Sequence, residues 1–234
     1  MLVPNFEFSI YGFLVLIGAI VSIGLIMFRL LLKKQEILRE INILSIIFIF
    51  SICGAKLLYL LTHGSKVVES HVFFDLTNGF SFFGAIYMCF IVIIVMDKNT
   101  ENFVLKLVNE VIFVVPLWYS FIRIGCFFSS CCYGISYKGI GAVYYLNVSI
   151  APNGVLLFPL QLVDSILNFI LAIYLYHSST KNKLKVYCFS YGFIRFLLEF
   201  FRSPELKIMI SILSIDQINA IIILLFGAYF GKKK

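Results

Sequence analysis

Long apolar runs separated by short polar stretches recur along the whole chain. Seven apolar segments are visible, most of them near the roughly 20 residues that a helix needs to cross a bilayer. They lie at about residues 10–28, 41–62, 79–96, 103–122, 159–177, 186–201 and 208–230. No repeat or low-complexity linker divides them. The pattern predicts one polytopic domain, residues 1–234, of the all-α integral membrane class with seven transmembrane helices.

The composition supports a membrane protein and argues against a soluble domain. Of the 234 residues, 61% are hydrophobic and 13% are charged, and the mean hydropathy is +1.00. A soluble domain of this size cannot bury that much apolar surface. The formal net charge of +7 comes from basic residues clustered at the ends of the apolar segments. Such clusters are typical topology signals, so we expect the lipid bilayer as a partner and no nucleic acid.

The distribution of lysine and arginine predicts the orientation of the chain. Twelve of the 19 lie in the loops of one side and four in the loops of the other, while Lys56, Arg123 and Arg195 lie in or at the segments. The positive-inside rule then places the N-terminus outside and the C-terminus in the cytoplasm. The first 28 residues carry no Lys or Arg. The first segment therefore lacks the basic start of a cleaved signal peptide and is expected to be a retained span.

With this orientation, the polar residues within the segments all fall in the outer half of the membrane. The set is Tyr11, Lys56, Arg123, Gln161, Asp164, Arg195, Glu199, Ser214, Asp216 and Gln217. Ionisable groups inside a bilayer are costly and mark functional sites. We therefore expect a polar cavity that opens outward or sideways into the outer leaflet.

The stretch from Arg123 to Gly134 holds the densest candidate chemistry. Arg123 is expected at the outer end of the fourth segment, where an arginine needs a partner or an anionic ligand such as a lipid phosphate. Cys126, Cys131 and Cys132 follow within ten residues. They fit three interpretations, namely packing residues, a disulfide at an oxidising outer face, or a metal or redox-active site. No fourth zinc ligand is evident, and neither a metal ion nor another cofactor is expected.

A polar stripe runs along the sixth segment. Tyr191, Arg195, Glu199 and Arg202 are spaced by 4, 4 and 3 residues, so they share one helical face. One interpretation is a buried ion pair that orders helix packing. The other is a wall of the cavity, with Glu199 holding a guanidinium group that meets phosphate bidentately.

The longest external connection, residues 135–157, contains glycines, tyrosines and β-branched residues. This composition fits two interpretations. One is a small β-hairpin that covers the cavity mouth and guides a second substrate, and the other is a plain connector.

Seven motifs, in order along the chain, match a known family. They are Ile10-Tyr-Gly-Phe13, Gly54-Ala-Lys-Leu-Leu-Tyr59, Gly79-Phe-Ser-Phe-Phe-Gly84, the stretch Arg123 to Gly134, Phe158-Pro-Leu-Gln-Leu-Val-Asp164, Tyr191-Gly-Phe-Ile-Arg-Phe-Leu-Leu-Glu-Phe-Phe-Arg202 and Leu213-Ser-Ile-Asp-Gln217. The chain resembles prolipoprotein diacylglyceryl transferase, a multi-pass enzyme of the bacterial plasma (inner) membrane, nearly from end to end. The motif at 191–202 is close to the family's Tyr-Gly-x-x-Arg-x-x-x-Glu-Phe-x-Arg.

The resemblance implies a reaction and its partners. A diacylglyceryl group passes from phosphatidylglycerol to the thiol of the lipobox cysteine in a preprolipoprotein, a thioether forms, and glycerol 1-phosphate leaves. The implied catalytic residues are Tyr191, Arg195, Glu199 and Arg123, with the arginines on phosphate, Glu199 orienting Arg195, and Tyr191 donating a hydrogen bond or transferring a proton. The implied substrate-binding residues are Tyr11, Lys56, Gly84, Cys126, Cys131, Gly134, Gln161, Asp164 and Arg202.

Some family residues are replaced in this chain. The family histidine of the third span is Phe83 here, and its asparagine and glutamate after the arginine are Cys126 and Cys131. A thiol needs a base near neutral pH because its free pKa is about 8.5. No histidine is expected near the site, since His63 and His71 are expected in an external loop and His177 in the cytoplasm. The base that deprotonates the thiol could therefore be Tyr191, Glu199, Asp164 or a cysteine thiolate.

Two other functions stay open beside the transferase. One is a non-catalytic or altered-acceptor paralogue that binds anionic phospholipid. The other is a thiol-based redox protein of the membrane.

Overall fold

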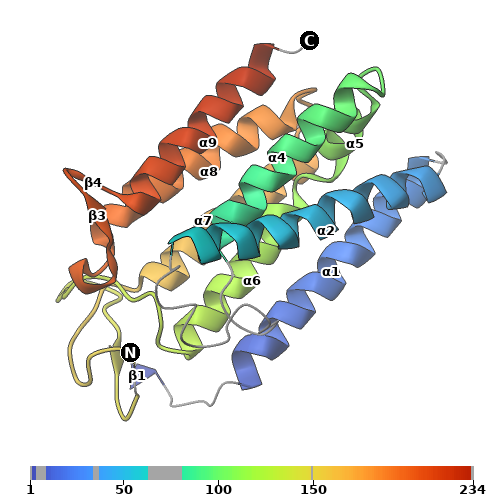
Figure 1. The fold of residues 1–234 in the computed structure, drawn as a ribbon. Coiled ribbons are helices and arrows are strands. Elements are labelled where there is room, and N and C mark those ends of the chain that lie inside the picture. The colour runs from blue at the N-terminus through green and yellow to red at the C-terminus, as the bar shows by residue number, and fades with distance from the viewer. Residues whose placement is uncertain (1, 4–8, 34–36, 63–80, 149, 233–234) are drawn as a thin grey trace. The chain divides into compact units, whose positions relative to one another are not determined.

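The computed structural model describes residues 2–3, 9–33, 37–62, 81–148 and 150–232, and most of them are helical (Figure 1). His63, Lys66, His71 and Gly79 lie outside the described residues. The helices are α1 (Ser9–Lys33), α2 (Ile37–Thr62), α4 (Phe82–Lys98), α5 (Phe103–Val111), α6 (Val114–Phe128), α7 (Leu160–His177), α8 (Lys183–Leu198) and α9 (Ile215–Lys232). Two short 3-10 helices follow α8, η1 (Glu199–Phe201) and η2 (Pro204–Leu206).

Four of these helices are long and apolar enough to span a membrane, namely α1, α2, α7 and α9. A fifth span is possible if α5 and α6, which meet at 42°, are counted together. The helices α4 and α8 are shorter, at 17 and 16 residues. A helical membrane protein is therefore supported, while the full set of seven spans remains a prediction.

The expected fourth segment, 103–122, is wrong in its bounds. The chain breaks between Val111 and Val114, and α6 then continues to Phe128. The break is invisible in the hydropathy pattern because Ile112 and Phe113 are themselves apolar and buried. As a result Arg123 lies inside α6, with more than one helical turn beyond it, and not at the end of a span.

The chain forms two compact units, residues 30–108 and the remainder, residues 1–29 with 109–234. In the unit 30–108, α2 packs along α4. Gly54 and Gly84 make this packing possible, because a Cβ atom on either glycine would overlap the backbone carbonyl of the other. In the larger unit, α6 packs on α7, α7 on α8, and α8 on α9, and Figure 1 shows α8 and α9 side by side.

The segment between α6 and α7 folds over its own small core, which is built from Phe127, Tyr133, Val143, Tyr145, Ala151 and Leu157. The strand β2 (Tyr144–Tyr145) pairs in parallel with β1 (Leu2–Val3). Isolated bridges join Leu157 to Ser136 and to Val143. A hairpin within residues 135–157 is not confirmed.

A short antiparallel ladder lies instead directly before α9. It joins β3 (Met209–Ile210) to β4 (Leu213–Ser214) through a turn at Ser211, whose φ is 59°. The seventh apolar segment was expected to start at residue 208, but α9 starts at Ile215. The residues of the ladder are as apolar as those of a membrane-spanning helix, so hydropathy alone does not distinguish the short strands from the start of the helix.

Candidate functional site

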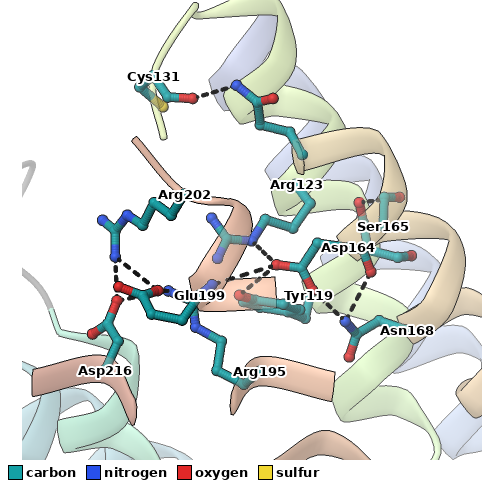
Figure 2. Close-up of polar contacts among 12 residues, drawn as sticks. Tyr119, Arg123, Cys131, Asp164, Ser165, Asn168, Arg195, Glu199, Arg202 and Asp216 are labelled. Carbon is teal, nitrogen blue, oxygen red and sulfur yellow. Dashed lines mark hydrogen bonds and ion pairs between the residues drawn. The ribbon is translucent and has the colours of Figure 1, made fainter. Parts of the chain in front are cut away.

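Six charged side chains meet where α6, α7, α8 and α9 approach one another in the larger unit (Figure 2). Three are arginines and three are carboxylates, so their formal charges balance. They are Arg123 from α6, Asp164 from α7, Arg195 from α8, Glu199 and Arg202 from the turn after α8, and Asp216 from α9. We call these six residues the charged cluster.

Asp164 lies at the centre of the charged cluster and is only 1% exposed. Its Oδ2 atom is 2.7 Å from Nε of Arg123 and 3.8 Å from Nη1 of Arg195. The Tyr119 hydroxyl donates to the same oxygen at 3.3 Å, and Asn168 Nδ2 donates to Oδ1 at 2.8 Å. The guanidinium groups of Arg123 and Arg195 therefore converge on one carboxylate.

Asp216, on the other side of the charged cluster from Asp164, contacts Arg195 and Arg202. Nη2 of Arg195 donates a hydrogen bond to Asp216 Oδ2 at 2.7 Å, and Nη1 of Arg202 contacts the same oxygen. Glu199 is farther away, with Oε2 at 3.5 Å from both Arg195 and Arg202. By distance, Asp216 is thus a closer partner of Arg195 than Glu199, which the resemblance had implied as the residue that orients it.

Aromatic rings pack beside Arg123. The Arg123 guanidinium lies 4.9 Å from the centre of the Tyr119 ring. Tyr119 meets Tyr191 edge-on at 5.6 Å, and Tyr191 stacks on Tyr187 at 5.5 Å. The spacing of Tyr191 and Arg195 in sequence predicted their common face, whereas Tyr119 was missed. Its one available signal was its position one helical turn before Arg123.

Several buried polar atoms of this region lack a hydrogen bond within the described residues. They include both carboxylate oxygens of Glu199, Nε of Arg202 and Oε1 of Gln161. Buried polar atoms in folded proteins are nearly always hydrogen-bonded, so atoms of this kind indicate where a ligand or water binds.

The three cysteines after Arg123 form a second cluster beside the charged one. Their Sγ atoms all lie within 4.8 Å of one another, and all three are free thiols. The carbonyl of Cys131 accepts a hydrogen bond from Gln161 Nε2 at 2.6 Å (Figure 2). Hydrogen bonds from Cys126 and Cys131 lower the pKa of the Cys132 thiol below its ordinary value, and Arg123 and Arg202 act in the same direction. We call these three residues the thiol cluster.

The remaining predicted residues occupy different surroundings. Gly134 lies where the backbones of Phe158 and Phe201 leave no room for a Cβ atom. A glycine here therefore allows the chain segments around residues 134, 158 and 201 to approach one another closely. Tyr11 packs against Gly125 of α6. Lys56 and Gly84 belong to the unit 30–108, and their place at the site remains a prediction.

The comparisons with known proteins point to one family. The family model described as prolipoprotein diacylglyceryl transferase matches residues 1–231. A phosphatidylglycerol–prolipoprotein diacylglyceryl transferase of Clostridium tetani is 31% identical over 236 residues, which cover 96% of this chain and 93% of that protein. A second such protein, numbered 2, from Clostridium perfringens is 32% identical and covers 95% of this chain and 90% of its own length. The chain belongs to the prolipoprotein diacylglyceryl transferase family.

Proposed function

We propose that this protein transfers the diacylglyceryl group of phosphatidylglycerol to the cysteine thiol of a lipobox-containing preprolipoprotein and releases glycerol 1-phosphate. The observation that carries this proposal is the convergence of Arg123 and Arg195, from two different helices, on the single oxygen Oδ2 of Asp164. Two guanidinium groups that meet at one carboxylate oxygen are also placed to meet the oxygens of one phosphate.

The phosphate binds on the sides of the arginines that face away from Asp164. Arg123 contacts Asp164 through Nε, and its terminal nitrogens make no hydrogen bond to any described residue. In Arg195, Nη1 is 3.8 Å from Asp164, too far for a hydrogen bond. These donors are available to phosphate without loss of the short pairs that hold each arginine.

The reaction makes negative charge grow on the phosphate. The acceptor sulfur forms a bond to the glyceryl carbon while the bond from that carbon to the phosphate oxygen breaks. The leaving phosphate takes the electron pair and passes from one negative charge toward two. Positive groups fixed at this position stabilise that change more in the transition state than in the ground state, and this lowers the barrier.

Glu199 binds the glycerol head group in this proposal. Its carboxylate is 1% exposed, lies beside two arginines, and has two oxygens without a hydrogen bond to the described residues. The glycerol of the head group carries two hydroxyl groups close to the phosphate, and hydroxyl groups donate to carboxylate oxygens. The same contact accounts for a preference for phosphatidylglycerol among phospholipids.

The proposal includes the membrane arrangement. We propose seven spans, with α4 and α8 among them, in the bacterial plasma (inner) membrane, with the N-terminus outside and the C-terminus in the cytoplasm. The charged cluster then lies at the depth of the outer leaflet, where phosphatidylglycerol and the lipobox peptide enter from the bilayer. Residues 1–234 form one domain in this proposal.

A reconstituted assay tests the proposal. The purified protein, in nanodiscs with phosphatidylglycerol, is mixed with a lipobox peptide, and mass spectrometry follows the peptide. The expected product is a peptide heavier by one diacylglyceryl group, with glycerol 1-phosphate formed in equal amount. A peptide whose cysteine is replaced by serine is the matched control. A folded protein that yields neither product refutes the proposal.

A further inference from the structure

The thiol cluster sits on a turn with unusual backbone geometry. Cys126 belongs to the last turn of α6, and Cys131 N donates to the Cys126 carbonyl at 3.2 Å, which folds the following turn back onto the helix. Ser130 and Cys132 both have positive φ, at 52° and 56°. Non-glycine residues in this region are strained, and such strain gathers at functional sites. The turn brings three thiols together that a simple continuation of α6 would separate.

The sulfur positions are compatible with one thiophilic ion held by all three cysteines. A zinc ion bound by three thiolates at about 2.3 Å needs sulfur atoms roughly 3.8 Å apart in a tetrahedral site. The three Sγ atoms of the thiol cluster all lie within 4.8 Å of one another. A disulfide uses two sulfur atoms at about 2.05 Å, and all three cysteines are free thiols. Small shifts of three side chains complete the metal site.

Two positively charged side chains lie beside the thiol cluster. Arg123 interacts electrostatically with Cys126 and Cys132, and Arg202 interacts with Cys132. Three thiolates around a divalent cation carry one net negative charge, and a fourth thiolate would make it two. Two neighbouring guanidinium groups offset that charge.

The thiol cluster supplies three ligands and no more. Among the His, Cys, Asp and Glu side chains of the described residues, none joins these three cysteines within ligand distance. Zinc sites with three protein ligands keep their fourth position for water or substrate. In this protein the substrate that suits such a position is itself a thiol.

We propose that Cys126, Cys131 and Cys132 bind a thiophilic divalent cation of the zinc type, whose open fourth position binds the acceptor thiol. This revises the expectation, drawn from the sequence, that no metal ion is bound. The second half of the inference rests on the proposed function. The acceptor thiol loses its proton to water when it binds the cation, because a coordinated thiol is deprotonated. Its sulfur then attacks the glyceryl carbon, and the cation keeps its oxidation state throughout.

This arrangement supplies the activation that transfer to a thiol requires. A free thiol of pKa about 8.5 is only a few per cent thiolate near neutral pH. His177 lies in the last turn of α7, and no histidine belongs to the charged cluster or the thiol cluster within the described residues. A bound cation makes a separate base unnecessary, because the thiol proton leaves before the carbon–oxygen bond breaks.

Metal analysis of the full-length protein tests the inference. The protein is purified in detergent without chelators, and zinc is measured by mass spectrometry together with a count of free thiols. We expect about one zinc ion per chain in the wild type and in Cys53→Ser, and a large loss in Cys131→Ser and Cys132→Ser. Equal metal content in all four proteins overturns the inference, as does a disulfide between any two of the three cysteines in active protein.

Cobalt substitution keeps the test decisive if a variant fails to fold. Co²⁺ added to the stripped wild-type protein should give sulfur-to-metal charge-transfer absorption, and a lipobox peptide should shift the cobalt spectrum while its Cys→Ser form does not. Removal of the metal should lower transfer roughly tenfold or more, since only a few per cent of a free thiol is ionised. If the cobalt spectrum does not change when the lipobox peptide is added, the inference that the acceptor thiol binds at the fourth metal position is refuted.

The two proposals fail in different ways. If the protein holds zinc and the peptide shifts the cobalt spectrum but no lipidated product forms, the metal site stands and the proposed transferase function fails. If stripped protein transfers diacylglyceryl at the full rate, the transferase function stands and the metal inference fails.

Discussion

Arg123 and Asp164 form a buried ion pair that joins α6 to α7, with Nε 2.7 Å from Oδ2. The two side chains are 11% and 1% exposed, so water contributes little to their stabilisation. Removing one member of a buried pair leaves the other charge uncompensated, which is far more harmful than loss of an exposed pair. The pair therefore contributes both to the stability of the fold and to the position of the arginine.

Asp164→Asn should destabilise the protein, because Arg123 and Arg195 then lose their shared counter-ion. We expect a loss of about 3–5 kcal/mol in the free energy of unfolding. Phosphatidylglycerol should restore part of the loss, since its phosphate supplies negative charge to the same two arginines. Thermal unfolding in nanodiscs with and without phosphatidylglycerol measures both effects.

Glu110→Gln is the matched control for Asp164→Asn. Glu110 pairs with Arg29 at 3.7 Å, and the two side chains are 32% and 21% exposed. Such partly exposed pairs contribute roughly 0–1 kcal/mol. A drop in stability as large in Glu110→Gln as in Asp164→Asn would contradict the assigned role of the central carboxylate.

Arg195→Lys should strongly reduce transfer despite the retained positive charge. The lysine ammonium cannot serve Asp216 and a phosphate at once, because it lacks the planar fork of donors. We expect kcat/KM to fall about 100-fold or more, as it does when a donor to a developing oxyanion is removed. Arg29→Lys, at the separate pair with Glu110, should keep wild-type kinetics. Near-normal turnover by Arg195→Lys would count against direct phosphate contact.

Asp216→Asn should impair activity more than Glu199→Asp. Asp216 contacts Arg195 at 2.7 Å and also holds Arg202, whereas Glu199 Oε2 is 3.5 Å from each arginine. Asp216 is a positioning residue, so its loss should raise KM for phosphatidylglycerol and lower kcat together. Steady-state kinetics over a range of lipid fractions separates the two constants. The reverse order of the two variants would contradict the role of Asp216 as the closer support of Arg195.

Gly54→Ala and Gly84→Ala should each loosen the contact between α2 and α4. A methyl group at either position overlaps the other glycine's carbonyl, and overpacking of this kind costs about 1–3 kcal/mol. Thermal unfolding of the purified variants measures this effect. Gly24→Ala is the control, because no atom of the described residues lies within 4 Å of its Cβ position. Full stability in Gly84→Ala, together with loss of lipid binding, would favour the predicted substrate-binding role of Gly84.

The sequence by itself determined the helical membrane character, because apolar runs of bilayer length specify helices wherever they fold. It also determined the common face of Tyr191 and Arg195 on α8, since contacts within one helix follow from spacing alone. The expected helical face did not extend to Glu199 and Arg202, because α8 ends at Leu198 and a 3-10 turn follows. The family assignment followed from the same motifs.

Only the tertiary structure decided which carboxylate serves which arginine. Arg123 and Asp164 are 41 residues apart and Arg195 and Asp216 are 21 apart, so helix packing selects the pairs. The same holds for Tyr119, which becomes part of the site only because α6 lies against α7 and α8. The break before α6 and the ladder before α9 were also hidden from the sequence. Hydropathy measures how apolar a residue is, whereas backbone bends and side-chain partners depend on what the folded chain brings near it.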